Sequence, residues 1–132
     1  MTIPIELKIK AIGALSSVSE VAFNPKYLAD DVSVLAISFM EENEFQIAVD
    51  ETVRELELLV NKKKNPSPLL YNHSELSSSH YQSVRSKKQK ADLRLIFKTN
   101  SNPLQVIMFG HRHQPKDIYD ELTVRKHHEP CG

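Results

Sequence analysis

The chain contains very little cysteine, glycine or tryptophan. Its one cysteine, Cys131, is the penultimate residue, so no disulfide can form within the chain and a reducing compartment is favoured. With three glycines and no tryptophan, the chain has no Gly-rich phosphate-binding loop. No apolar run reaches the length of about 18 residues that a membrane span requires, and Glu6, Lys8 and Lys10 interrupt the pattern of a signal peptide. We therefore expect a soluble cytoplasmic protein without a membrane partner.

Charge is distributed unevenly along the chain. Residues 1–60 carry 4 Lys/Arg and 11 Asp/Glu, whereas residues 61–132 carry 13 and 6. This asymmetry indicates a basic surface for a polyanion, although the two halves could also fold together and neutralise each other. A length of 132 residues predicts a single domain spanning residues 1–132, with residues 124–132 as a flexible tail.

The N-terminal segment has the pattern of a strand. Residues 2–10 alternate between apolar and other residues, which places four apolar side chains on one face: Ile3, Ile5, Leu7 and Ile9. Pro4 favours an edge position, because proline cannot donate a ladder hydrogen bond. We therefore predict an edge strand over residues 2–10.

Two helical patterns follow. The first begins at Asn24-Pro25, a capping residue followed by a proline in the first turn. The second begins near Asn43, which forms a capping-box pattern with Gln46. Apolar residues then recur at intervals of three and four up to Val60. The short connection between these helices predicts an antiparallel helix pair.

The most informative stretch comes later. Residues 93–98 alternate, with Leu93 and Leu95 on one face of a strand and Arg94 on the other. Residues 104–109 are almost entirely apolar, as expected of a strand covered on both faces. The intervening residues 99–103 have turn chemistry. Basic and imidazole groups cluster before and after this predicted hairpin, so we expect a site for phosphate groups there.

The order of these features resembles the RelE/ParE family of small toxins, chiefly the RelE-type branch that cleaves messenger RNA. The family pattern is a strand with an arginine near its start, a turn, an apolar strand, a glycine, a basic doublet and a short helix with a tyrosine. In this chain the pattern falls on Ala91 to Phe97, Leu104 to Gly110, His111-Arg112 and Asp117-Ile118-Tyr119. The resemblance implies an α+β fold, with a twisted antiparallel sheet, an N-terminal two-helix hairpin packed on one face and a shallow basic cleft on the other.

The resemblance also implies which residues act. The catalytic candidates are Arg85, Lys87, Arg94, Arg112, Tyr119 and His111. Three further residues are candidates for RNA binding: Lys88, Lys90 and His113. Arginines suit the charge that develops on phosphorus when a ribose 2′-hydroxyl attacks it, a crowded lysine can act as a base, and a tyrosine can stack an RNA base.

The function implied is the toxin of a type II toxin–antitoxin pair, a metal-independent and cofactor-free endoribonuclease that acts on messenger RNA on the ribosome. Its partner would be a cognate antitoxin with an acidic tail that folds on binding. Two alternatives remain open: a ParE-like inhibitor of DNA gyrase, and a non-catalytic module that binds RNA or a partner. A metal site is a further reading, with candidate ligands His111, His113, His127, His128 and Cys131.

Overall fold

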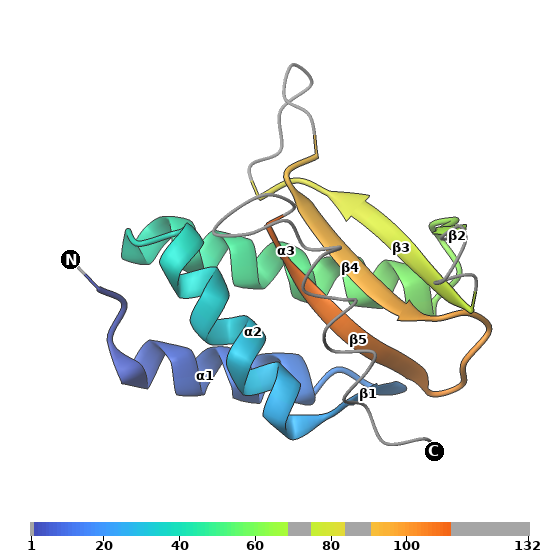
Figure 1. Ribbon diagram of the computed structural model, residues 1–132, viewed down its shortest axis with the longest axis horizontal. Coiled ribbons are helices and arrows are strands. Elements are labelled where there is room, and N and C mark those ends of the chain that lie inside the picture. Colours follow the sequence, from blue (N-terminus) through green and yellow to red (C-terminus); the bar gives the residue numbers. More distant parts are fainter. Residues whose placement is uncertain (1, 69–74, 84–90, 112–132) are drawn as a thin grey trace.

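The computed structural model describes residues 2–68, 75–83 and 91–111. Figure 1 shows the elements in chain order: α1 (Ile5–Ser16), β1 (Val21–Phe23), α2 (Pro25–Ser38), α3 (Glu42–Val60), β2 (Ser67–Pro68), β3 (Leu76–Tyr81), β4 (Leu93–Lys98) and β5 (Leu104–His111). The strands form one sheet in the order β1-β5-β4-β3-β2. β1 runs parallel to β5, and the other neighbours are antiparallel. The fold is therefore α+β with a mixed sheet, and the prediction of a wholly antiparallel sheet is wrong at β1.

The N-terminal segment is a helix, so the prediction of a strand over residues 2–10 is wrong. The apolar residues on its inner side recur every four positions: Ile3, Leu7, Ala11 and Leu15. Ile5 and Ile9, which completed the alternating pattern, are 69% and 61% exposed. Pro4 occupies the N-cap, where a proline does not interrupt the helix, and its carbonyl accepts a hydrogen bond from the Leu7 N–H at 3.1 Å.

The two later helices confirm the helical patterns predicted for residues 25–60. At the start of α2 the Asn24 side chain accepts a hydrogen bond from the Lys26 N–H at 3.0 Å, which satisfies one donor of the first turn. The capping box predicted at the start of α3 does not form. That helix begins at Glu42, and the Gln46 amide instead donates to the Asp50 carboxylate at 2.9 Å.

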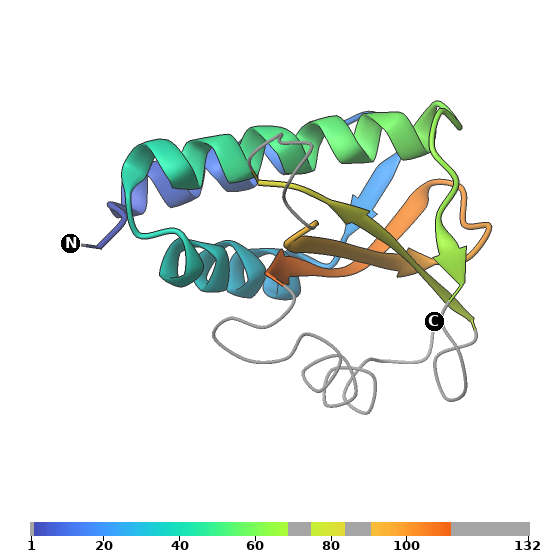
Figure 2. The same cartoon turned by 90° about the horizontal axis from the view of Figure 1, so that it is seen from above.

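The sheet separates two apolar clusters. Figure 2 shows α1 and α3 on one side of the sheet and α2 beside β5. The main cluster joins all three helices to the inner side of the sheet, where Leu93, Leu95 and Phe97 of β4 point toward the helices. A smaller cluster lies on the outer side of the sheet and consists of Leu76, Ile96, Ile107 and Met108. The central strands β4 and β5 are therefore buried on both sides.

The helical assignment of the N-terminal segment predicts which of its apolar residues stabilise the fold. Leu15→Ala should lower the free energy of unfolding by about 2–5 kcal/mol, because Leu15 is fully buried in the main cluster. Ile9→Ala is the matched control and should change it by less than about 0.5 kcal/mol, since this side chain is mostly exposed. Urea unfolding would measure both values, and equal losses would contradict the helix.

Candidate functional site

Two of the nine candidate residues lie within the described part of the chain. They are Arg94, on β4, and His111, at the end of β5. The other seven lie outside the described residues: Arg85, Lys87, Lys88, Lys90, Arg112, His113 and Tyr119. The predicted tail at residues 124–132 also lies outside them. The geometry of the site is therefore built from Arg94 and its neighbours in the sheet.

Arg94 lies on the outer side of the sheet, as its alternation with Leu93 and Leu95 predicted. Its side chain is buried, with 7% of the residue surface exposed. The guanidinium Nη1 donates to the main-chain carbonyls of Ala91 at 2.8 Å and Leu93 at 3.0 Å. These acceptors are neutral, so they satisfy hydrogen bonds without compensating the positive charge.

The charge of Arg94 has no carboxylate partner among the described residues. The ion pairs in this part of the chain join Arg54 to Glu51 and Lys64 to Glu55. Removing a charged group from water is costly unless an opposite charge compensates it. A buried guanidinium that is bonded only to carbonyls is therefore suited to receive an anion, and its fork of donors matches phosphate.

The residue opposite Arg94 on the next strand is a glycine. Arg94 pairs with Gly110 on β5, so the two residues share the outer side of the sheet. Gly110 has a φ of 153°, a conformation that residues with a side chain rarely adopt. Within the described part of the chain no atom lies within 4 Å of a Cβ built on Gly110, although Gly110 itself is buried.

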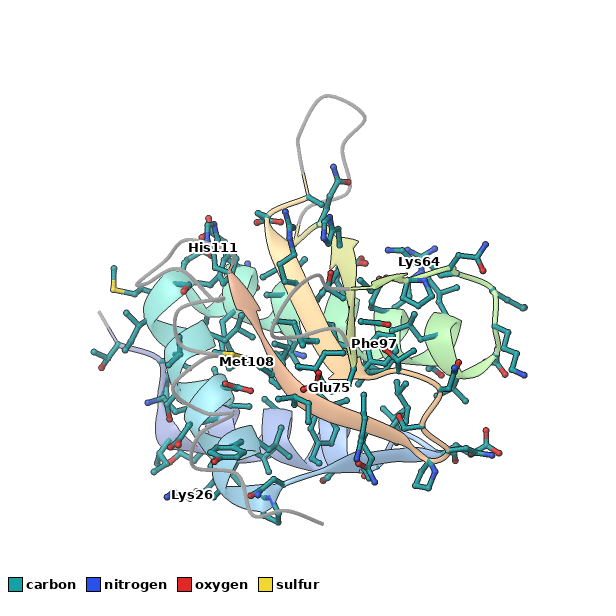
Figure 3. The ribbon with its side chains drawn as sticks, turned by 45° about the vertical axis from the view of Figure 1, so that its right-hand side comes forward. Lys26, Lys64, Glu75, Phe97, Met108 and His111 are labelled. Carbon is teal, nitrogen blue, oxygen red and sulfur yellow. The ribbon has the colours of Figure 1, made fainter. Side chains whose placement is uncertain are left out.

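His111 is not brought together with Arg94. It pairs with Leu93, which points toward the helices, so His111 shares the inner side of the sheet. Its ring lies 6.2 Å from the ring of Phe39, the C-cap residue of α2. Figure 3 shows His111 at the end of β5 beside α2, with Lys64 across the sheet beside β3.

The structure instead places His80 beside Arg94. These two residues are direct partners across β3 and β4, and His80 is exposed. Its Nε2 lies 3.3 Å from the Ser78 hydroxyl, two residues earlier on the same side. The sequence alone did not indicate His80, because its relation to Arg94 depends on strand pairing. The alternation of Ser78 and His80 was the one local signal that these residues share a face.

A buried carboxylate on α3 holds β3 in place beside this site. Glu55 is only 3% exposed, and it accepts a short hydrogen bond from the Ser79 hydroxyl. The Lys64 ammonium lies 2.5 Å from Glu55 and also donates to the His80 carbonyl at 2.6 Å. Because one carboxylate contacts both the serine and the lysine, α3 fixes the strand on either side of the His80 peptide.

A second polar contact joins α3 to β3 at Tyr81. Thr52 is fully buried and its hydroxyl donates to the Ala48 carbonyl at 2.8 Å. The Tyr81 hydroxyl lies 2.8 Å from Thr52 and must be the donor of that bond, because Thr52 has only one hydroxyl proton. Burial raises the pKa of Tyr81 far above its ordinary value, because the ionised phenolate would lose its contact with water.

The raised pKa of Tyr81 predicts how stability depends on pH. The fold favours the neutral phenol, whereas Tyr81 in the unfolded chain ionises near a pKa of about 10. The contribution of Tyr81 to the free energy of unfolding is therefore complete below about pH 10. Above that pH the free energy of unfolding falls by at most about 1.4 kcal/mol per pH unit. Tyr81→Phe should reduce this loss in urea unfolding at alkaline pH. An unchanged pH dependence in the variant would contradict the buried, protonated phenol.

The described residues contain neither a cluster of metal ligands nor a helix that could cross a membrane. Residues 2–68, 75–83 and 91–111 contain no group of three or more His, Cys, Asp or Glu side chains arranged to hold a metal ion. Of the ligands in the metal reading, only His111 falls in these ranges. No helix in the described part is long and apolar enough to cross a membrane.

Comparison with known proteins does not assign a family. No protein-family model, curated protein or solved structure matches the chain. The resemblance to RelE/ParE toxins therefore stays a prediction from the sequence. The α+β fold follows from the arrangement of the helices and strands.

Proposed function

We propose that this chain is a RelE/ParE-like toxin of a type II toxin–antitoxin pair and that it cleaves messenger RNA on the ribosome in the cytoplasm. The reaction is attack of a ribose 2′-hydroxyl on the adjacent phosphate, without a metal or another cofactor. Its partners are the message and a cognate antitoxin.

The order of the secondary-structure elements supports this proposal. The helices α2 and α3 precede three consecutive antiparallel strands, β3, β4 and β5. This is the succession that the resemblance implies, and the arginine of the pattern falls near the start of β4. Arg94 also lies on the side of the sheet that faces away from the main apolar cluster, and the resemblance implies a cleft on the face opposite the helix pair. The helix α1 and the parallel pairing of β1 with β5 are not part of that succession.

The observation that carries the proposal is that the buried charge of Arg94 has no carboxylate partner in the described part of the chain. Nη1 is occupied by the carbonyls of Ala91 and Leu93, which fixes the plane of the guanidinium. Arginine has five N–H donors, and those on Nη2 and Nε have no partner among the described residues. A preorganised donor in a buried position stabilises developing phosphorane charge far better than a solvated one.

The acidic residues of α3 support the expected type of antitoxin contact. Exposed carboxylates follow this helix and its N-terminus: Glu41, Glu42, Glu44, Asp50 and Glu57. They would repel an acidic antitoxin tail from the helical side of the protein. The opposite side of the sheet, which carries Arg94 and Lys98, is the more favourable surface for that tail.

Replacement of Arg94 tests the proposal directly. Arg94→Met preserves much of the side-chain volume and removes the charge, so it should lower single-turnover cleavage by about 10²–10³-fold. Binding to the ribosome should change much less, because phosphate contacts are many and individually weak. The rate would be measured with a short message on a programmed ribosome, with a chelator present.

Lys98→Met is the matched control for this experiment. Lys98 lies on the same strand and the same side of the sheet as Arg94, but it is exposed at the far end. Its loss should leave the cleavage step nearly unchanged. If Arg94→Met and Lys98→Met lower the cleavage rate by the same small factor, the positive charge of Arg94 only attracts RNA. Thermal melting of Arg94→Met would separate a loss of chemistry from a loss of fold.

A further inference from the structure

We propose that His80, and not His111, takes the proton from the ribose 2′-hydroxyl beside Arg94; this assignment rests on the function proposed above. His80 lies outside the stretch in which the sequence located an acid or base. Three features of the structure support its role: its register with Arg94, the contacts that hold its main chain, and the exposure of its ring.

The register brings the two side chains as close as a sheet allows. Glu75 lies opposite Thr99, and the Thr99 N–H donates to the Glu75 carbonyl at 3.0 Å. Hydrogen-bonded and non-hydrogen-bonded pairs alternate along an antiparallel ladder, so the odd-numbered residues of β3 are the ones bonded to β4. The His80 carbonyl points to the other edge of β3, where Lys64 binds it. His80 and Arg94 are therefore a non-hydrogen-bonded pair, the type in which facing side chains lie closest.

The main chain at His80 is held from the helical side. β2 pairs with Ser77 and Ser78 only, so the edge of β3 beyond them is not covered by a strand in the described part of the chain. Lys64 occupies this edge at the His80 carbonyl, and Glu55 fixes the ammonium. These contacts fix the main chain that carries the ring, and the ring itself contacts the Ser78 hydroxyl through Nε2 at 3.3 Å.

The ring itself is accessible to a substrate. His80 is exposed, whereas Arg94 beside it is buried. An imidazole nitrogen that carries no proton can accept one from a hydroxyl. His111, by contrast, lies on the inner side of the sheet against Phe39.

The reaction step balances with His80 as the base. The 2′-oxygen forms a bond to phosphorus, and its proton moves to an imidazole nitrogen of His80. The bond between phosphorus and the 5′-oxygen breaks, and this oxygen leaves with the electron pair and takes a proton from water. The products are a 2′,3′-cyclic phosphate and a 5′-hydroxyl. The phosphorane charge develops between Arg94 and the newly formed imidazolium, which is favourable for both cations.

The test is single-turnover cleavage of a short message on a programmed ribosome by the full chain as a function of pH. The wild-type rate should rise with pH, because a base must be unprotonated to act. His80→Gln should lower the rate by about 10²–10⁴-fold and remove this dependence. Added imidazole should restore part of the rate to His80→Ala. Melting temperatures should be unchanged, because the side chain is exposed.

Lys64→Met separates positioning from chemistry. It removes the contact to the His80 carbonyl but leaves the imidazole, so the rate should fall by up to about 10²-fold while the dependence on pH remains. The role of His80 would be overturned if His80→Gln kept the wild-type rate and its pH dependence. It would also be overturned if His111→Gln lost that dependence instead. Either result would leave the proposed function standing. A wild-type chain that cuts no message would overturn the proposed function, and the role of His80 with it.

Discussion

The buried strand β4 is the constraint on which the rest of the structure depends. Its residues from Leu93 to Phe97 are each no more than 7% exposed, and they point alternately toward the helices and toward the outer side of the sheet. A shift of one residue would exchange Arg94 with a leucine and place a charge in the main apolar cluster. The register is therefore fixed by hydrophobic burial. Arg94, His80 and Gly110 are brought together as a consequence.

The sequence predicted the elements with long and regular patterns. The helices within residues 25–60 follow helical spacing, and the strand pair at 93–98 and 104–109 follows from alternation, apolar character and a turn. The N-terminal helix was misread because Ile5 and Ile9 are apolar but exposed, so they completed a false alternation. The spacing of four between Ala11 and Leu15, both buried, was the available signal for a helix. β1 has three residues and pairs in parallel with a strand about 80 residues later, which no local pattern encodes.

The site was predictable only as far as local alternation reaches. Alternation placed Arg94 on the outer side of the sheet, and the structure agrees. It could not place His80 opposite Arg94 or His111 on the inner side, because both follow from pairing between strands. The link from Glu55 to Lys64 and Ser79 was likewise invisible, since it joins residues that are 9 and 24 positions apart. Contacts of this kind depend on how the elements pack.

The central claim is that the Arg94 side of the sheet cleaves RNA. The most direct measurement is to express the chain without a partner in a bacterial cell and to sequence the ends of all cellular RNA together with the DNA bound to gyrase. The account predicts messages cut within their reading frames, with 5′-hydroxyl and 2′,3′-cyclic phosphate ends, and normal supercoiling. Intact messages together with accumulated cleaved gyrase–DNA complexes would contradict it.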